Sequence, residues 1–411
     1  MQRVLAQILE RLIVEGRLVV RWPDGRETAY GKGDRLSAGV AIKDAATVRR
    51  LVFNPSLALG EAYMAGTVVP IGCNLYELLD LLVANVMAAG NGTPIMRLRA
   101  RSGRLVRRIM QYNPAPRARR NAAHHYDLSG RLYALFLDCD RQYSCAYFRH
   151  GEESIDEAQA AKKRHIAAKL LLDRPELSVL DIGSGWGGLA LTLARDFRAR
   201  VFGITLSTEQ LAESRARAAA LGLAERVRFE LLDYRALDQR FDRIVSVGMF
   251  EHVGIGHYDA FFAAVRRCLA PDGIALLHAI GRSDGPGVTN RWIDKYIFPG
   301  GYCPALSEVL PRIERTGLLV TDVEILRLHY AETLARWRLR FLANREAITG
   351  FTEERFCRMW EFYLVAAELA FRREGHMVFQ IQLARSLDAV PLTRDYIPDA
   401  ERRAARTQSL V

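Results

Sequence analysis

The sequence has no long uncharged apolar run, so we do not expect a membrane-spanning helix. The longest candidate, LYELLDLLVANVMAAG, is interrupted by Glu77 and Asp80. The first residues, MQRVLAQILERLIVEG, carry charges throughout and predict an amphipathic helix rather than a signal peptide. We therefore expect a cytoplasmic protein that lies on a membrane surface and does not cross it.

Cysteine is also scarce, with six residues in a chain of 411 and no C-x-x-C pair. This spacing indicates neither a zinc site nor a disulfide framework, and we expect no bound metal. A reducing cytoplasm fits such free cysteines best.

Acidic residues are missing from one region, residues 97–120, which holds nine of the arginines. The chain has a formal net charge of +11, and this run predicts an anionic partner, either nucleic acid or an acidic lipid surface. The simpler alternative is a solvated linker whose charge is incidental. The arginines lack the interleaved aromatic residues that stack on bases, so we favour an anionic phospholipid bilayer and expect no nucleic acid.

The pattern of apolar residues changes on either side of this run. Before it, RLVVRWPDGRETAYG predicts a β-hairpin turning at residues 23–25, and helices follow, including one over 75–89. We expect a small α+β membrane-associating domain over residues 1–95 and a basic linker over 96–121. A catalytic domain is expected over 122–411.

The expected catalytic domain alternates apolar strands with alanine-rich helices, which is typical of an α/β fold with a mostly parallel sheet. The runs LLVTDVEIL and VFQIQLAR are expected to close the sheet as an antiparallel edge. Between them, two helices over 331–349 and 353–373 form an insertion rich in Trp, Phe, Leu and Arg. We expect this insertion to act as a helical lid on an apolar pocket.

One strand–turn–helix stretch, VLDIGSGWGGLALTLA, carries the strongest cofactor signal. Gly183, Gly185 and Gly188 satisfy G-x-G-x-x-G, a pattern that alone is weak. Asp181 ends the strand where a carboxylate would repel a pyrophosphate, and the next strand, RVFGITLS, has no acid for a ribose. A carboxylate here favours S-adenosylmethionine, which has an ammonium and a sulfonium group but no phosphate. The alternative is a turn that serves only close packing.

Polar residues follow the other strands at the edge where ligands bind in such sheets. Thr205 and Gln210 follow the second strand and suit the ribose and carboxylate of the cofactor. Asp233 follows the third strand and is expected to accept from the adenine amino group, while Tyr234 stacks on the ring.

Two titratable residues, Glu251 and His278, end the fourth and fifth strands and are expected to converge. At a cofactor site such a pair indicates proton transfer. The alternatives are a helix N-terminal carboxylate for Glu251 and a buried structural histidine for His278. Upstream, the aromatic segment 124–148 is either a packing lid or a segment that folds over the cofactor, with Tyr143 and Ser144 touching it.

The chain resembles the cyclopropane fatty acid synthases, which include the mycolic acid cyclopropane synthases and related lipid methyltransferases. The resemblance covers nearly the whole chain, because GEAYMAGTV near residue 60 is also similar to the N-terminal domain of the bacterial phospholipid enzymes. The other motifs that carry it are HHYDLSG, YSCAYF, VLDIGSGWGG, GITLSTEQ, FDRIVSVGMFEHVG, HAIG, KYIFPGGY and HYAETLARW.

The resemblance implies methyl transfer from S-adenosylmethionine to a cis double bond in a phospholipid acyl chain. A carbocation would form, and a bound bicarbonate would remove a proton from the new methyl group as a cyclopropane ring closes. The resemblance also implies a homodimer on the inner face of a bacterial cell membrane. The implied bicarbonate holders are Cys145, mainly through its backbone N–H, with Glu251, His278 and Tyr330. The implied cofactor residues are Tyr143, Ser144, Asp181, Gly183, Gly185, Gly187, Thr205, Leu206, Gln210, Asp233 and Tyr234.

The sequence departs from the family pattern at Ser184 and Ala367, where the family commonly has cysteine. We expect little effect from Ser184, and Ala367 leaves ring formation possible. The alternatives are a sibling enzyme that makes a methyl, methylene or hydroxy-methyl branch, a small-molecule methyltransferase, and a non-catalytic lipid-binding module.

Overall fold

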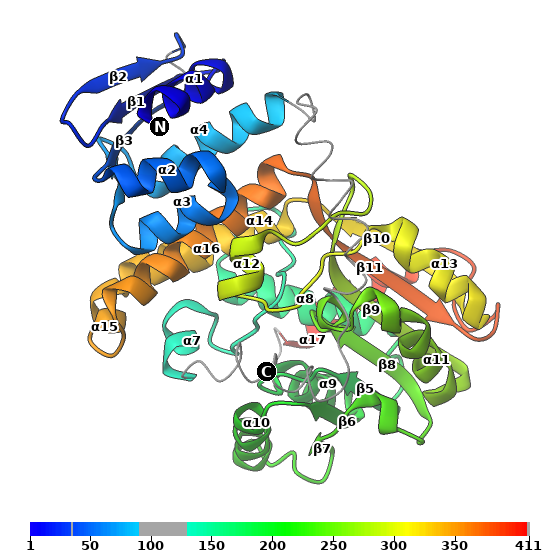
Figure 1. Cartoon of the computed structure of the whole chain (residues 1–411). Helices are drawn as coiled ribbons and strands as arrows, with labels where there is room; N and C mark the ends of the chain where they lie inside the picture. The colour runs from blue at the N-terminus through cyan, green and yellow to red at the C-terminus, as the bar shows by residue number, and fades with distance from the viewer. Residues whose placement is uncertain (34–35, 90–129, 409–411) are drawn as a thin grey trace. The chain divides into compact units, whose positions relative to one another are not determined.

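The computed structural model describes residues 1–33, 36–89 and 130–408, which form two compact units (Figure 1). The described part of the first unit comprises residues 1–89, 288–299 and 334–376. That of the second comprises residues 130–287, 300–333 and 377–408. The arginine-rich run over 97–120 and most of the HHYDLSG motif lie outside the described residues.

The first unit contains a four-stranded sheet in the order β2-β1-β3-β4. Its strands are β1 (Arg17–Arg21), β2 (Glu27–Tyr30), β3 (Ser37–Ile42) and β4 (Val68–Ile71). β1 and β2 pair antiparallel, which confirms the predicted hairpin. The predicted amphipathic helix is α1 (Gln2–Leu12), which buries Leu5 and Leu9 against this sheet's core.

Helices from three distant stretches of sequence complete the first unit. They are α2 (Ala45–Phe53), α3 (Pro55–Met64), α4 (Leu75–Ala88), α12 (Arg291–Tyr296), α15 (Arg345–Thr349) and α16 (Glu354–Arg373), with most of α14 (His329–Ala343). Asp80 of α4 accepts two hydrogen bonds from the guanidinium of Arg373 at 2.8 and 2.9 Å. The Tyr63 hydroxyl donates to Glu361 at 3.0 Å.

The placement of the insertion differs from its predicted assignment to the catalytic domain. Residues 334–376 group with the N-terminal residues, because α16 packs its apolar and charged side chains against α3 and α4. The sequence predicted the two helices but did not indicate which other helices they pack against.

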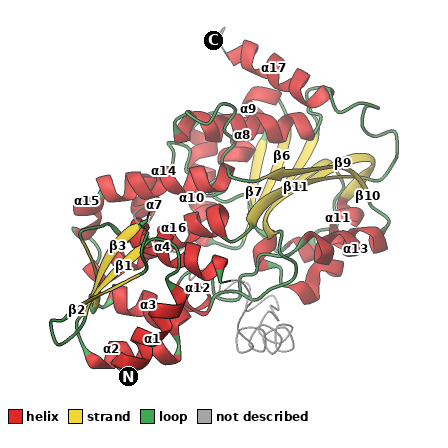
Figure 2. Ribbon diagram, turned by 90° about the horizontal axis from the view of Figure 1, so that it is seen from above, coloured by secondary structure: helices red, strands yellow, loops and turns green. Residues whose placement is uncertain are grey.

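The second unit is built on a seven-stranded sheet in the order β10-β11-β9-β8-β5-β6-β7 (Figure 2). The strands are β5 (Ser178–Ile182), β6 (Arg200–Thr205), β7 (Val227–Leu231), β8 (Phe241–Val247), β9 (Leu269–Arg282), β10 (Leu319–Leu326) and β11 (His376–Ala384). Strands β5 to β9 pair in parallel, and β10 pairs antiparallel with β11 at the edge. The predicted α/β fold with an antiparallel edge is confirmed.

Helices cover both faces of this sheet (Figure 2). They do so because its central strands have apolar side chains on both faces. Val179 of β5 packs with α8 (Ile155–Lys169), α9 (Gly188–Phe197) and α10 (Thr208–Ala220). Leu180, the next residue, packs with α11 (Tyr258–Cys268) and α13 (Leu306–Thr316). The other α-helices of the described part of this unit are α7 (Gly130–Phe136) and α17 (Tyr396–Gln408).

Within residues 1–33, 36–89 and 130–408, no helix has both the length and the apolar character needed to cross a bilayer.

Candidate active site

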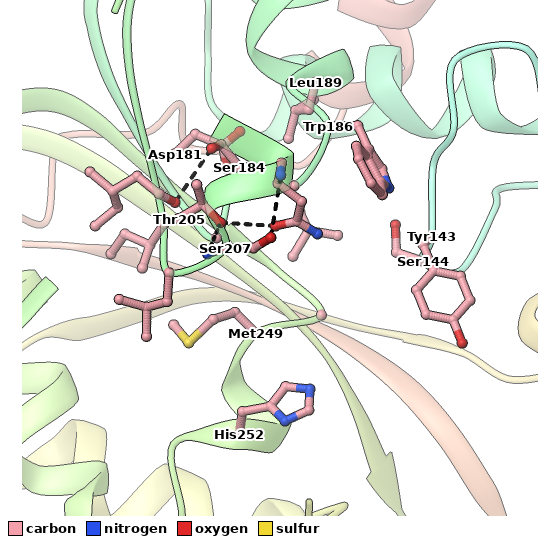
Figure 3. Close-up of a pocket in the computed structure, with 18 of the residues that line it drawn as sticks. Tyr143, Ser144, Asp181, Ser184, Trp186, Leu189, Thr205, Ser207, Met249 and His252 are labelled. Atoms are coloured by element: carbon pink, nitrogen blue, oxygen red, sulfur yellow. Dashed lines mark hydrogen bonds between the residues drawn. The ribbon is translucent and has the colours of Figure 1, made fainter. Parts of the chain in front are cut away.

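The carboxyl ends of the parallel strands surround a pocket in the second unit (Figure 3). This is the edge at which open α/β sheets bind ligands. The lining contains ten of the eleven residues that the sequence suggested for the cofactor: Tyr143, Ser144, Asp181, Gly183, Gly185, Thr205, Leu206, Gln210, Asp233 and Tyr234. The eleventh, Gly187, does not line the pocket.

The glycine turn between β5 and α9 explains this difference. Gly185 has φ +53° and, among the described residues, nothing within 4 Å of the position of a Cβ, so it leaves open space in the pocket. Gly187 has φ +82°, and a Cβ there would meet side-chain atoms of Phe229 and Ser214 at 2.9 Å. Gly185 therefore keeps room for a ligand, whereas Gly187 permits close packing behind the turn.

Asp181 places a buried carboxylate at the base of the pocket. Its side chain is 2% exposed, and its Oδ2 atom has no hydrogen-bond partner in the described part of the chain. Burial raises the pKa of Asp181 from 3.8 to about 7, although the nearby Lys162 cation acts in the opposite direction. A carboxylate in this state is suited to a cationic group of a ligand, which would supply the missing partner.

The end of β6 is held by short polar contacts. The Thr205 hydroxyl donates to Oε1 of Gln210 at 2.8 Å. Ser207 caps α10, because its hydroxyl accepts from the Gln210 N–H at 3.2 Å. These contacts fix the two predicted side chains at the pocket wall.

Asp233 and Tyr234, which follow β7, also line the pocket. Asp233 binds the guanidinium of Arg235 at 2.7 and 2.8 Å, so its charge is partly compensated. The Tyr234 ring packs edge-on against Phe261 at 5.3 Å, and burial raises the pKa of its hydroxyl to about 12. Tyr234 thus stays a neutral aromatic side chain.

The segment around Tyr143 is held from two sides. The Tyr143 ring packs against Tyr133 at 5.2 Å and Phe136 at 6.4 Å, both from α7. From α8, Lys162 donates to the Ser144 hydroxyl at 2.9 Å and Gln159 donates to the Ser144 carbonyl at the same distance. Both predicted residues therefore belong to an ordered wall of the pocket.

The structure places Glu251 against the strand that carries His278, and their predicted convergence stays a prediction. Glu251 lies in a one-turn 3-10 helix (Phe250–His252), and its Oε1 accepts from the Ile280 N–H at 2.6 Å, two residues after His278 on β9. Its Oε2 is buried without a partner among the described residues, and burial raises the pKa of Glu251 to about 7.

His278 is a buried neutral imidazole. Burial, with added repulsion from cations such as Lys162, holds its pKa well below the ordinary 6.5. Its Nδ1 lies 3.1 Å from Nε2 of Gln380. With this amide nitrogen as donor, Nδ1 accepts and the ring proton lies on Nε2, where it can face a ligand.

The segment of Cys145 contacts the helix that carries Tyr330. The N–H of Ala146, next to Cys145, donates to Thr333 at 3.0 Å, and Thr333 lies one helical turn from Tyr330 on α14. Both predicted residues are buried. Burial raises the pKa of the Cys145 thiol, so it is not a thiolate.

None of these four residues lines the pocket of Figure 3, but Ser144 next to Cys145 and His252 next to Glu251 do. Sequence reasoning missed several lining residues. Trp186 and Ser207 stood within the motifs used to find the site, and His252 follows Glu251 directly. Lys162, which lies behind the wall, gave no signal because a lysine in a helix ordinarily indicates a solvent-exposed face.

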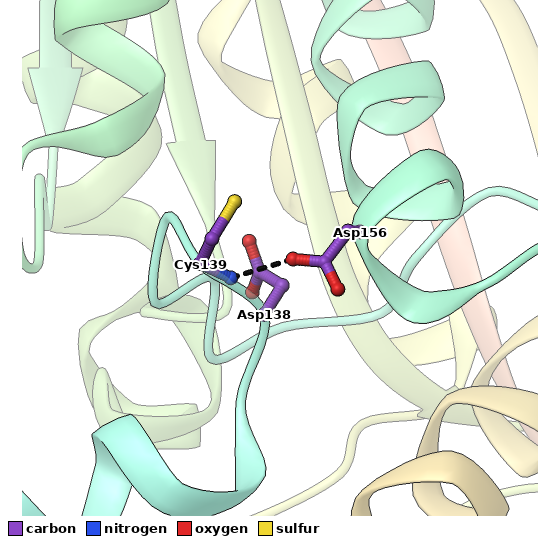
Figure 4. Close-up of side chains that lie close together, drawn as sticks. All are labelled: Asp138, Cys139 and Asp156. Atoms are coloured by element: carbon purple, nitrogen blue, oxygen red, sulfur yellow. Dashed lines mark hydrogen bonds between the residues drawn. The ribbon is translucent and has the colours of Figure 1, made fainter.

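One group of possible metal ligands occurs among the described residues: Asp138, Cys139 and Asp156 (Figure 4). The carboxylates already accept backbone hydrogen bonds, Asp156 from Cys139 at 2.7 Å and Asp138 from Gln142 at 2.7 Å. Burial and the neighbouring carboxylates raise the pKa of the Cys139 thiol, which disfavours the thiolate that a metal needs. These contacts explain the group as turn-stabilising, and we assign no metal to it.

Comparison with known proteins identifies the family. Residues 114–381 match the model of mycolic acid cyclopropane synthetase, and residues 4–89 match a domain of unknown function. Cyclopropane-fatty-acyl-phospholipid synthase of Escherichia coli is 37% identical over 85% of this chain and 89% of its own. Tuberculostearic acid methyltransferase UfaA1 of Mycobacterium tuberculosis is 36% identical over 92% of this chain and 90% of its own.

A solved structure of mycolic acid cyclopropane synthase CmaA1, complexed with SAH and CTAB, is 33% identical. It covers 66% of this chain and 99% of its own, with a TM-score of 0.61. The resemblance inferred from the motifs is confirmed. The chain belongs to the mycolic acid cyclopropane synthetase family of S-adenosylmethionine-dependent methyltransferases.

Proposed function

We propose that this protein converts cis double bonds in phospholipid acyl chains into cyclopropane rings. One observation carries the proposal. Two buried carboxylate oxygens at the same edge of the sheet have no partner among the described residues. They are Asp181 Oδ2 in the pocket and Glu251 Oε2 beside it. Two buried acids in distinct surroundings suit one cationic ligand and one hydrogen-bonded reaction partner.

Bound S-adenosylmethionine would supply an electrophilic methyl group, and bound bicarbonate would supply a weak base for the methyl proton. Asp181 would bind the ammonium of the cofactor, and Gly185 leaves space for it. Thr205 and Gln210 would bind its ribose and carboxylate, Asp233 and Tyr234 its adenine, and Tyr143, Ser144 and Leu206 complete the wall.

Four buried residues beside the pocket would hold the bicarbonate. His278 would donate from Nε2, and Cys145 would donate from its backbone N–H. Glu251 and Tyr330 would orient the anion, with Glu251 Oε2 as the acceptor that lacks a partner among the described residues. The arrangement would place a weak base beside the reacting methyl group.

A carbocation on the acyl chain needs surroundings without a strong nucleophile. Burial raises the pKa of the Cys145 thiol, so this sulfur stays protonated and weakly nucleophilic. The burial of Glu251 raises the pKa of that carboxyl as well, which lowers its negative charge at neutral pH. Both effects would favour loss of a proton over capture of the cation.

The relative UfaA1 supports a second product class, because its name records a tuberculostearic acid methyltransferase and it matches more of this chain than the synthase does. In that case the same carbocation would lead to a methyl- or methylene-branched chain. The retention of Glu251, His278 and Tyr330 favours ring closure.

The test uses purified protein, vesicles of unsaturated phosphatidylglycerol, and S-adenosylmethionine with a trideuterated methyl group, followed by mass spectrometry of released acyl chains. A cyclopropane retains two deuteriums and resists mild hydrogenation. A methylene branch retains two but is hydrogenated, and a methyl branch retains three. The absence of labelled lipid, with cofactor binding intact, would refute a lipid substrate.

We also propose that the protein acts at the inner, cytoplasmic surface of the cell membrane, bound to anionic lipid. The support is the sequence of residues 97–120, with nine arginines and no acid. Replacement of Arg104, Arg107 and Arg108 by Glu should release the protein from phosphatidylglycerol vesicles, and added salt should do the same. Unchanged vesicle binding would refute this proposal. The homodimer stays a prediction, which light scattering would test.

A further inference from the structure

The second unit contains a buried lysine that the proposed mechanism does not use. Lys162 lies in the middle of α8 and is 0% exposed. Its ammonium donates to Oε1 of Gln142 at 2.6 Å and to Oγ of Ser144 at 2.9 Å. Both partners are neutral. A buried cation normally pairs with a carboxylate, so neutral partners leave its charge available to other groups.

The carboxylates nearest to Lys162 are engaged elsewhere. Asp138 accepts from the backbone N–H groups of Gln142 and Asp140. Asp140 itself binds Lys163 and Arg217. Asp138 still offsets part of the charge of Lys162, but the hydrogen bonds of the ammonium go to the two neutral partners.

The charge of Lys162 acts on three residues of the site. At His278 it adds to the effect of burial, and both lower the pKa. At Asp181 and Cys145 burial raises the pKa, and the charge of Lys162 opposes this effect. Lys162 also contacts Ser144 directly, and Ser144 precedes Cys145 in the chain. The buried cation thus lies behind the wall that joins the pocket to the residues proposed to hold bicarbonate.

We propose that Lys162 is a positioning residue with two effects. Its hydrogen bonds to Gln142 and Ser144 set the segment that presents Cys145, and its positive charge favours an anion held by that segment. The inference rests on the proposed function, in which bicarbonate binds at Cys145, Glu251, His278 and Tyr330, and it assigns the source of positive charge for that anion.

The neighbouring Gln159 provides a matched control. It lies on the same helix, three residues earlier, and is also fully buried. Its amide donates to the carbonyls of Gln142 at 3.2 Å and Ser144 at 2.9 Å. Gln159 therefore holds the same segment with two hydrogen bonds but carries no charge.

The experiment compares Lys162→Met and Gln159→Met in the full chain. Calorimetry measures S-adenosylhomocysteine binding. The rate of labelled lipid formation is measured against added bicarbonate in buffer depleted of carbon dioxide. A third measurement, independent of turnover, is the rise in melting temperature that bicarbonate causes when S-adenosylhomocysteine is bound.

We expect both variants to weaken S-adenosylhomocysteine binding by a similar small factor, because both loosen the wall. Lys162→Met should raise the bicarbonate concentration for half-maximal rate by about tenfold or more and should reduce the melting response to bicarbonate. Gln159→Met should reduce both bicarbonate responses much less than Lys162→Met does, because it loosens the same segment but leaves the charge of Lys162 in place.

Bicarbonate responses that fall equally in the two variants would overturn the inference, because the charge of Lys162 would then add nothing to its hydrogen bonds. A wild-type enzyme that labels lipid without any response to bicarbonate would overturn it too, while methyl transfer would stand. Wild type that labels no lipid would refute the proposed function instead, and the melting response would still test Lys162. Should Lys162→Met fail to fold, Lys162→Gln repeats the comparison.

Discussion

Replacement of Asp181 by asparagine tests the cofactor site most directly, because it removes one charge with almost no change in shape. Burial raises the pKa of Asp181 from 3.8 to about 7. The native state therefore holds this proton more tightly than the unfolded chain does. At about 1.4 kcal/mol per pH unit, the ionised carboxylate costs on the order of 4 kcal/mol in the ligand-free protein.

The sign of the pH dependence follows from the raised pKa. The stabilising contribution of the protonated acid is fully present below the unfolded value near pH 4 and is lost as the pH rises to about 7. The Asp181→Asn variant has no such dependence, because an amide does not titrate. The stability of the variant relative to the wild type should thus increase by about 2–3 kcal/mol between pH 5 and pH 8. Calorimetric melting of both proteins without ligand measures this difference, in which pH-independent effects of the amide cancel.

The affinity of the wild type for the cofactor should increase with pH, whereas its stability decreases. A bound ammonium favours the ionised carboxylate, so the wild type should release a proton on binding and should lose affinity by up to about tenfold per pH unit below pH 7. The Asp181→Asn variant should bind about 10–100-fold more weakly at pH 8, without that pH dependence. A stability difference that does not vary with pH, together with unchanged affinity, would refute the reasoning.

Two further variants test the fold and the proposed chemistry. Gly60→Ala would bring a Cβ within 2.5 Å of the Trp292 indole, so we expect the first unit to lose about 1–3 kcal/mol in urea unfolding. Gly256→Ala, which meets nothing within 4 Å among the described residues, should stay within about 0.5 kcal/mol, and equal losses would contradict the packing argument. Glu251→Gln keeps an acceptor for the Ile280 N–H but removes the carboxylate, so labelled product should form about 100-fold more slowly with unchanged S-adenosylhomocysteine affinity. A rate within a few-fold of the wild type would exclude Glu251 from the reaction.

The sheet and its ligand edge were predictable because each signal is local. A run such as VLDIGSG predicts a strand followed by a turn within a few residues. The carboxyl ends of parallel strands must then meet at one edge of the sheet. The placement of Glu251 beside the strand of His278 follows from the same rule, since β8 and β9 are neighbours.

The remaining features depend on contacts between distant residues. The pairing of Asp80 with Arg373 spans 293 positions, and nothing near either residue indicates the other. Lys162 was missed because a lysine in a helix ordinarily indicates a solvent-exposed face, and its partners Gln142 and Ser144 lie on an irregular segment. The arginine run over 97–120 lies outside the described residues, so its prediction stays untested.

The composition of the first unit has a consequence for synthesis on the ribosome. Its N-terminal helices emerge first, but α16, which carries the partner of Asp80, ends only at Arg373. The faces of α3 and α4 that contact α16 therefore lack this packing partner until most of the chain has been translated. The first unit therefore completes its packing only after α16 has been translated, and chaperones that shield nascent apolar helices should bind α3 and α4 until then.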